Sequence, residues 1–353
     1  MFRFESGKAG QIELTDVCCM LAAVKSPRRL PSLLAMTGIA FLLSACGNPA
    51  PAAAHSFATE HAIVKAWWPQ HEAAFISADP ASLTALYAGP GLDEAEGEMS
   101  IARLKGSVPK YPRPFRGSVI FAPTSMHWFL AIVEYAPIDQ DGRAGSISMT
   151  FPGLIFIQVG GTWKATIGNV QAPIPHDYLG NGDAVLSTPL ADDRYIIAAA
   201  TVAASYVTYL NSLSSGHPVE GPFATGLNSF ASEVTRLMWP PGSIATTQFS
   251  FSVDIADAAT YSITAGITKV PEVVVFVLRR SVVIKPRQGC LVRRAADSWS
   301  DIVPAGSYRS VTLGSVVVVA ASVPLNDGDT SQGRKVIDAS GSVNDVTASA
   351  VKC

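Results

Sequence analysis

Acid–base chemistry at neutral pH needs a histidine or a carboxyl group with a shifted pKa that a substrate can reach. His71 fits this requirement best, because it shares the apolar face of a predicted helix with residues at helical spacing: Ile63, Trp67, Ala74 and Phe75. His127 and Glu134 lie on one predicted strand at an odd separation, which puts them on opposite faces and argues against a catalytic dyad. A histidine on such a helix face is more often part of the core. We favour that interpretation and keep His71 as the catalytic candidate of the alternative.

A run of acidic residues extends from Asp93 to Glu98 in the order Asp-Glu-Ala-Glu-Gly-Glu. We predict a loop here, which either binds a calcium ion or is solvated. The run lacks the alternating oxygen ligands of an EF-hand loop, so we favour the solvated loop and expect no metal site. The sequence also lacks the signatures of phosphate loops, nucleophile elbows, zinc proteases and dinucleotide-binding folds, and we expect no cofactor.

Thiol chemistry could involve five cysteines: Cys18, Cys19, Cys46, Cys290 and Cys353. None forms a C-x-x-C pair or a zinc-finger grouping with histidine. If the chain is cleaved before Cys46 and this residue is modified, Cys290 and Cys353 are the thiols that remain. They form either a disulfide, as expected in an oxidising compartment, or two unpaired thiols.

The residues before Cys46 have the order of an export signal. Residues 25–29 are positively charged, and residues 30–43 form an apolar segment shorter than the roughly 20 residues of a membrane span. The segment Leu43-Ser44-Ala45-Cys46-Gly47 then resembles the lipobox of bacterial lipoproteins at every position. The resemblance implies a diacylglycerol on the Cys46 thiol and removal of residues 1–45 as a signal peptide.

Two alternatives remain open for this region. An ordinary signal peptide, or a core helix with a chance cysteine, would explain the apolar segment without a lipid. We favour the lipobox because the charged segment, the apolar segment and the small residues coincide at the expected spacing. Translation from Met1 would give a long n-region with three acidic residues, whereas a start at Met20 would give a conventional one.

Residues 46–56 are rich in proline and alanine and are expected to form a tether between the lipid and the folded body. Two or three acyl chains on one residue hold a protein stably on a bilayer. The expected location is therefore the extracytoplasmic side of the cell membrane, with the acyl chains as the membrane contact.

The composition limits the classes of partner. The chain has 353 residues, of which 48% are hydrophobic and 15% charged, and its net charge is −2. Because the basic residues are scattered and form no stripe that could neutralise a row of phosphates, we expect no nucleic-acid partner.

The first predicted domain, residues 57–172, places helices before strands. Asp79-Pro80 is expected to start a second helix after the one that carries His71, and Pro69 is expected to kink or divide that first helix. Trp67 and Trp68 are adjacent, so one ring is expected inside and the other towards the surface. The strands that follow include a hairpin at Gly160-Gly161.

A second predicted domain repeats this order. Residues 173–190 are interpreted as a linker, and residues 191–325 as a domain that opens with a helix capped by Asp192-Asp193. The predicted buried residues of this helix are Ile196, Ile197, Ala200, Ala204 and Val207. Another helix is predicted over 223–237, before strands at 248–255, 261–268, 272–284 and 310–322. Residues 326–353 are expected to be a polar C-terminal tail.

Helices followed by strands, twice over, predict an α+β fold. The first domain is similar to the nuclear-transport-factor-2-like (SnoaL-like) cones, related in shape to cystatin, on the evidence of Asp79-Pro80-Ala-Ser-Leu-Thr-Ala-Leu-Tyr87 and of Gly161-Thr-Trp-Lys164. The whole chain resembles uncharacterised actinobacterial lipoproteins in which a lipobox precedes two such units. The resemblance implies two tandem cone-like domains, each with helices packed on a curved antiparallel sheet.

The leading functional hypothesis is a lipid-anchored envelope protein without catalytic activity that binds a partner protein or a small ligand. The alternative is an envelope enzyme of the isomerase or dehydratase kind, with His71 as the base inside a cone pocket. A cone interior filled with side chains favours binding or scaffolding, and an open pocket with His71 beside a carboxylate favours the enzyme.

Overall fold

The computed structural model describes residues 56–123, 127–170, 183–186, 195–215, 217, 219–224, 231, 245–253, 261–263, 272–293, 302–326 and 337–353. The predicted signal peptide, the predicted lipobox from Leu43 to Gly47 and the predicted tether up to residue 55 lie outside these residues. Within the described part of the chain, no helix combines the length and the apolar character needed to cross a membrane.

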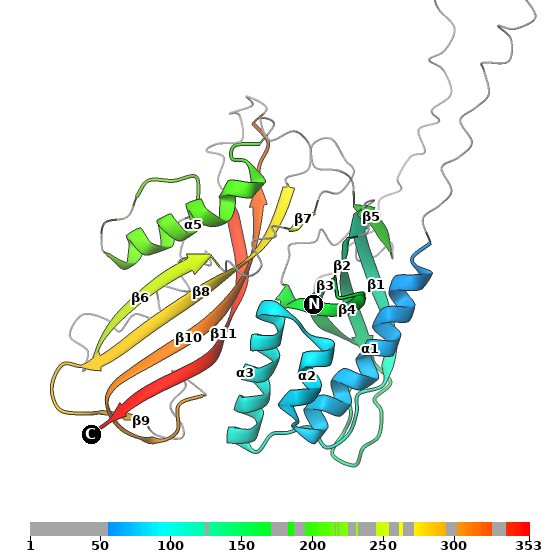
Figure 1. The fold of residues 1–353 in the computed structure, drawn as a ribbon, viewed down its shortest axis with the longest axis horizontal. Coiled ribbons are helices and arrows are strands. Elements are labelled where there is room, and N and C mark those ends of the chain that lie inside the picture. The colour runs from blue at the N-terminus through cyan, green and yellow to red at the C-terminus, as the bar shows by residue number, and fades with distance from the viewer. Residues whose placement is uncertain are drawn as a thin grey trace, which may run out of the picture. The chain divides into compact units, whose positions relative to one another are not determined.

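The folded chain begins with three helices, α1 (Ala58–Ser77), α2 (Pro80–Leu86) and α3 (Gly89–Lys105), shown in blue and cyan in Figure 1. α2 starts where the sequence predicts, because the Asp79 side chain caps it by accepting a hydrogen bond from the Ala81 N–H at 3.1 Å. α3 ends at Gly106, whose φ of 62° is the left-handed conformation that commonly terminates a helix.

The first sheet follows these helices. β1 (Phe115–Pro123), β2 (Trp128–Tyr135), β3 (Met149–Val159) and β4 (Thr162–Val170) form an antiparallel meander, and β5 (Ala184–Leu186) pairs in parallel with β1. The Gly-Gly hairpin is confirmed, since Gly160 and Gly161 have φ values of 57° and 82° and Val159 pairs with Thr162. Two positive φ angles are what a two-residue turn of the hairpin type requires.

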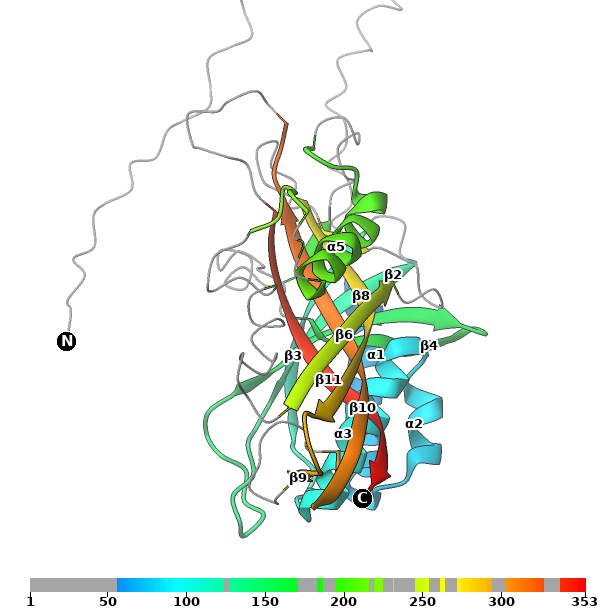
Figure 2. The ribbon, with the colours of Figure 1, turned by 90° about the vertical axis from the view of Figure 1, so that its left-hand side faces the viewer.

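The second sheet follows helix α5 (Ala199–Ser214). Its strands are β6 (Ala245–Val253), β7 (Tyr261–Ile263), β8 (Glu272–Pro286), β9 (Leu291–Arg293), β10 (Gly306–Val323) and β11 (Asp338–Lys352). The order is β11-β10-β8-β6, with β7 on β8 and β9 on β10, and every pairing is antiparallel. α5 packs against β6 and β8 (Figure 2). The fold is therefore α+β with curved antiparallel sheets, as predicted.

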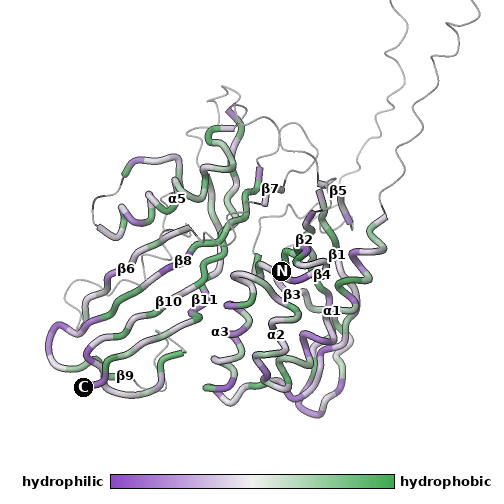
Figure 3. The backbone as a smooth tube through the Cα atoms, viewed as in Figure 1, coloured by the Kyte–Doolittle hydropathy of each residue, from purple (hydrophilic) through white to green (hydrophobic). Residues whose placement is uncertain are grey.

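Three apolar cores hold these layers together. One lies between α1–α3 and the first sheet, and includes Trp68, Leu83 and Phe129. A second lies between α5 and the second sheet. The third contains residues of both sheets, such as Ile155 from β3 and Val275 from β8. Parts of β8 and β10, Val273–Leu278 and Val316–Ala321, are buried on both faces. These parts are continuous apolar runs without alternation, and Figure 3 shows them as hydrophobic stretches.

This third core joins the two predicted domains. Residues 55–353 form one compact unit, and the cores show why: side chains of β1, β3 and β4 pack against side chains of β8 and β10. Each half thus has a core of its own and shares the third with the other half.

One prediction for α1 is wrong, and one of the two alternatives for Pro69 is excluded. Trp67 and Trp68 are both buried, at 4% and 1% exposure, instead of one facing outward. Each indole has a buried acceptor, since Trp67 Nε1 donates to the Leu86 carbonyl and Trp68 Nε1 to the Arg113 carbonyl. Pro69 does not divide α1, which continues to Ser77.

The acidic run from Asp93 to Glu98 is helical, not a loop, and lies within α3. Glu94 is 3% exposed, and its Oε2 accepts the Gly168 N–H of β4 at 3.0 Å. The helix approaches this strand closely, because a Cβ at Gly91 would lie 2.7 Å from the Thr166 carbonyl carbon. Glu94, a carboxylate of the predicted loop, thus serves the contact between α3 and β4.

Two segments predicted to be irregular contain strands. The linker at 173–190 includes β5, which extends the first sheet. The predicted tail at 326–353 includes β11, which pairs with β10 from Ser322↔Asp338 to Tyr308↔Lys352. β11 is an edge strand of small, mostly polar residues, so it lacks the apolar alternation on which the prediction relied.

The predictions for the helices of the second half were also partly wrong. α5 begins at Ala199, and Tyr195 forms a bridge with Leu325 instead of joining the helix. Its buried residues are not the predicted set but Val202, Ala203, Tyr206, Tyr209 and Leu210. Phe223 forms a bridge with Ile337, so the helix predicted at 223–237 does not start there. The rest of that prediction, apart from the non-helical Ala224 and the helical Ala231, lies outside the described residues.

Cys290 and Cys353 are joined by a disulfide with their Cα atoms 6.2 Å apart. Of the two alternatives left open by the sequence, the structure has the cross-link. It connects the residue before β9 to the residue after β11, and both strands pair with β10. Closing a loop with a sequence separation of 63 residues stabilises the fold by roughly 4 kcal/mol on the chain-entropy model.

Candidate functional site

His71, the catalytic candidate from the sequence, is enclosed by aromatic rings. It is 1% exposed, and its ring stacks on Trp67 with the centroids 4.8 Å apart. Phe75 and Phe151 contact it from other sides, with centroids at 4.7 and 5.7 Å. The Tyr87 hydroxyl lies 2.8 Å from Nδ1. The space between the helices and the first sheet is thus filled around this histidine.

Burial fixes the protonation state of this group. It lowers the pKa of His71 to about 3, with a further contribution from the charge of Arg113. Burial also raises the pKa of Tyr87 well above its ordinary value, so the hydroxyl keeps its proton and donates it to Nδ1. Nε2 then carries the ring proton and lies 3.6 Å from Glu72, without a hydrogen-bond partner. A neutral imidazole that is so weakly basic and so enclosed is a poor general base at pH 7.

Glu72 is held by Arg113 beside this histidine. Its side chain is 2% exposed and accepts hydrogen bonds from the Arg113 backbone N–H at 2.6 Å and from the guanidinium Nη2 at 2.7 Å. The guanidinium also lies over the rings of Trp68 and Tyr135, 5.2 and 4.8 Å from their centroids. Burial by itself would lower the pKa of Arg113. The hydrogen bonds to Glu72 and the charge of Glu72 outweigh this effect and raise the pKa of Arg113. This buried pair is a structural feature of the filled interior.

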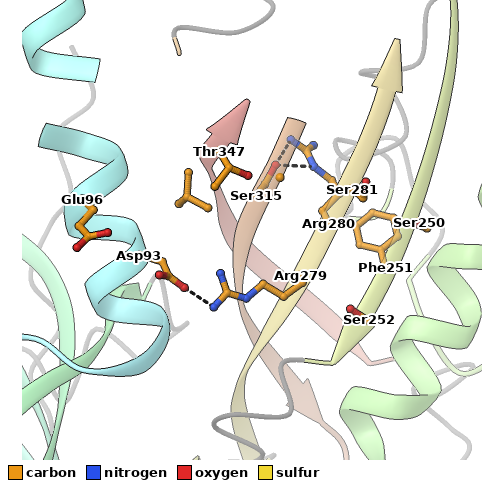
Figure 4. A pocket seen from close by; sticks show the side chains of 12 residues that line it. Asp93, Glu96, Ser250, Phe251, Ser252, Arg279, Arg280, Ser281, Ser315 and Thr347 are labelled. Carbon is orange, nitrogen blue, oxygen red and sulfur yellow. Dashed lines mark hydrogen bonds and ion pairs between the residues drawn. The ribbon is translucent and has the colours of Figure 1, made fainter. Parts of the chain in front are cut away.

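An open cavity lies elsewhere, where α3 faces the second sheet. It has a volume of about 380 Å³, and Figure 4 shows its walls. We call it the α3 groove and define it by six lining residues: Asp93, Glu96, Ser250, Arg279, Ser281 and Thr347. Asp93 and Glu96 are three positions apart on α3, so they lie on the same face of the helix. His71 does not line this cavity.

Strand register explains the shape of the groove floor. Ser250 on β6 pairs with Ser281 on β8, Ser281 with Gly314 on β10, and Gly314 with Thr347 on β11. Paired residues on neighbouring strands point to the same side of a sheet, so four small residues form one row across four strands. A Cβ at Gly314 would collide with the Thr347 hydroxyl, so glycine leaves room for that side chain. Because the side chains of this row are small, the face of the sheet has a depression here, and this depression is the floor of the groove.

Charged groups line the groove in compensating pairs. Arg279 on β8 reaches across to α3, where its guanidinium forms an ion pair with Asp93, drawn as a dashed line in Figure 4. Arg280 points to the other face of β8, as expected for the next residue of a strand, and binds Ser315 at 2.9 Å and Asp345 at 3.1 Å. Glu96 is the remaining charged residue of the six, and it is half-buried.

The groove was not predicted from the sequence. The acidic run was noticed but predicted to be a loop. No role was predicted for the strand residues that face this run in the structure. Adjacent small polar residues on one face of several predicted strands, such as Ser250 and Ser281, were the available signal. The pairing of β11 with β10, which the sequence did not predict, is needed to place Thr347 beside them.

The other predicted residues have separate locations. His127 is exposed and precedes β2, which begins at Trp128. Among the residues that the structure describes, no three side chains of His, Cys, Asp or Glu are grouped as for a metal ion. Comparison of the chain with protein-family models, with curated proteins and with solved structures found no match.

Proposed function

We propose that the chain is a lipid-anchored protein of the cell envelope, held on the extracytoplasmic side by acyl chains on Cys46, whose folded body binds a small ligand in the α3 groove. The lipobox of the sequence supports the anchor. The observation that carries the binding function is the groove itself, an open cavity with several polar side chains directed at one space. The aromatic filling around His71 favours binding over the isomerase-like alternative.

The chemistry of the groove favours a neutral ligand with several hydroxyl groups, such as an oligosaccharide. The hydroxyls of Ser250, Ser281 and Thr347 can both donate and accept hydrogen bonds. Glu96, which lines the same space, adds an acceptor. An anionic ligand would meet the carboxylates of Asp93 and Glu96, while the two arginines of the lining, Arg279 and Arg280, are each paired with a carboxylate.

The curved sheets covered by helices also support the finer proposal of cone-like halves. On this proposal, the helix-covered face of the first sheet is the cone interior, and it is occupied by Trp67, Trp68 and His71. Binding then takes place outside the cone, where α3 meets the second sheet.

Ligand binding can be tested by isothermal titration of the full chain in detergent with chitotetraose and cellotetraose. We expect weak but saturable binding of at least one neutral tetrasaccharide and none of tetragalacturonate. Ser281→Leu fills the groove floor with an apolar side chain and should weaken binding by about tenfold or more, a loss of about 1.4 kcal/mol.

The matched control for this test is Ser100→Leu. Ser100 is exposed on the same helix that lines the groove but is not part of the lining. It should bind like the wild type. Equal affinities in the Ser281→Leu and wild-type proteins, or a preference for the galacturonate, would contradict the proposed ligand class.

The anchor is tested separately by growing cells with radioactive palmitate and comparing wild type with Cys46→Ala. We expect the label on the wild-type chain only, and the variant chain should no longer partition with membranes, because the acyl chains are its proposed membrane contact. Equal labelling of both chains would exclude Cys46 as the lipid attachment site.

A further inference from the structure

A second cavity lies against the first turns of α1, with a volume of about 410 Å³. We call it the α1 hollow and define it by five of its lining residues: His61, Lys65, Phe115, Gly117 and Ser118. Two of them come from α1 and three from β1, so the hollow lies where the helix crosses the strand. It shares no lining residue with the α3 groove.

Three side chains in and beside this hollow form a continuous hydrogen-bonded series. His61 Nδ1 is 2.8 Å from Ser118 Oγ, and His61 Nε2 is 2.7 Å from Asp183 Oδ2. The other oxygen of Asp183 accepts the Ile120 N–H at 2.9 Å, which fixes the carboxylate beside β1. The members come from α1, β1 and the residue before β5, so only the folded chain brings them together.

This geometry meets the requirements of an activated serine nucleophile. A hydroxyl lies within hydrogen-bond distance of an imidazole, and a carboxylate on the opposite ring nitrogen orients the imidazole and stabilises its protonated form. In the Ser-His-Asp triad of serine proteases, Nε2 of the histidine faces the serine and Nδ1 faces the aspartate. Here Nδ1 faces Ser118 and Nε2 faces Asp183. Either nitrogen can accept a proton while the other donates one. The histidine and aspartate side chains are 35% and 28% exposed, so a substrate in solution can reach the group.

The hollow also offers donors for the negative charge that develops on a carbonyl oxygen. Lys65 lies one turn after His61 on the same helix face and lines the same space. The Ile120 N–H points away from β2 towards Asp183, and alternation along β1 directs the Ser118 N–H to the same side. The strand register shifts by a β-bulge at residue 116, next to Gly117 and Ser118 in the wall of the hollow.

We propose that Ser118, His61 and Asp183 form a catalytic site for the hydrolysis of carboxylic esters with short acyl groups. Ser118 Oγ attacks the carbonyl carbon while its proton passes to His61 Nδ1, and the bond to the leaving alcohol breaks as His61 returns that proton to the alkoxide. Water then attacks the acyl-serine by the same route and releases the acid. Phe115 and the alkyl stem of Lys65 form the apolar wall for the acyl group. Asp183 is the positioning residue.

The test uses the full chain in detergent, with p-nitrophenyl butyrate as substrate and a fluorophosphonate as the serine probe. We expect ester hydrolysis above the buffer rate and a phosphonate mass on the peptide that contains Ser118. Ser118→Ala should lose both, and His61→Gln should lower kcat by roughly 100-fold or more. Asp183→Asn should lower kcat with little change in KM, and Lys65→Met should lower kcat while Lys65→Arg retains it.

Ser100→Ala is the matched control, because this exposed serine on α3 lies in neither cavity, and it should keep the wild-type rate and label. Near-UV circular dichroism verifies that each variant is folded. If Ser118→Ala does not fold, Ser118→Cys replaces it, and its hydrolysis should become sensitive to iodoacetamide. A folded wild type that is not labelled at Ser118, or a serine variant that hydrolyses the ester at the wild-type rate, would overturn the proposal.

Discussion

Replacing Arg113 with leucine is expected to lower the free energy of unfolding by about 3–5 kcal/mol, because it leaves the carboxylate of Glu72 buried without its charged partner. Glu72 is 2% exposed, so water cannot take the place of the guanidinium. The substitution also removes the cation that lies over Trp68 and Tyr135. Urea denaturation, followed by tryptophan fluorescence, measures the loss.

The two partners differ in exposure, and this gives the prediction its control. Arg113 is 29% exposed, so in Glu72→Leu the stranded guanidinium can turn towards water and the loss should be smaller, about 3 kcal/mol. The double variant leaves no unpaired charge and should be more stable than Arg113→Leu alone. If the losses of the two single variants simply add in the double variant, the pair is not coupled and this account of the interior is wrong.

Local patterns predicted those parts of the fold that depend on neighbouring residues. Asp79-Pro80 marked the start of α2, because a cap and a proline act within one turn. Gly160-Gly161 marked the β3–β4 turn, because only glycine adopts two positive φ angles at little cost. The apolar runs of β8 and β10 indicated strands, although the sequence could not say that both of their faces would be buried.

Local sequence patterns could not predict the features that depend on residues far away in the sequence. β11 is a strand because β10 offers an edge along its length, and not because of its own polar residues. α3 is a helix through the acidic run because Glu94 binds Gly168 on β4 and Asn344 on β11. The buried face of α5 was predicted at the wrong residues, because small residues such as Ala200 and Ala203 carry little information about burial.

The candidate sites show the same limit. The sequence singled out His71 on its apolar spacing, and the same spacing buries it among rings, where its basicity is lost. His61 gave no such signal, because its partners Ser118 and Asp183 are 57 and 122 positions away. The chemistry of a histidine depends on contacts of this range, so its position on a helix predicts burial more reliably than function.

The burial of His71 should make the fold sensitive to acid. Its pKa is about 3 in the folded chain, below the ordinary value of 6.5 expected after unfolding. Between these values the unfolded chain binds a proton that the folded chain does not, so the free energy of unfolding falls as the pH falls, by up to about 1.4 kcal/mol per pH unit. The contribution is fully present above pH 6.5 and is lost progressively towards pH 3.

We therefore expect wild type to lose about 2–3 kcal/mol of stability from this group between pH 6 and pH 4, measured by urea denaturation at each pH. His71→Gln keeps a polar partner for the Tyr87 hydroxyl but does not titrate, so the difference in stability between wild type and this variant should shrink, or change sign, as the pH falls. Glu72, Tyr87 and Arg113 are present in both proteins, so the difference isolates the imidazole. His217→Gln removes an exposed histidine and should follow wild type at every pH. Parallel losses in wild type and His71→Gln would mean that His71 binds its proton as readily in the folded chain as in the unfolded one, and that the rings around it do not exclude water.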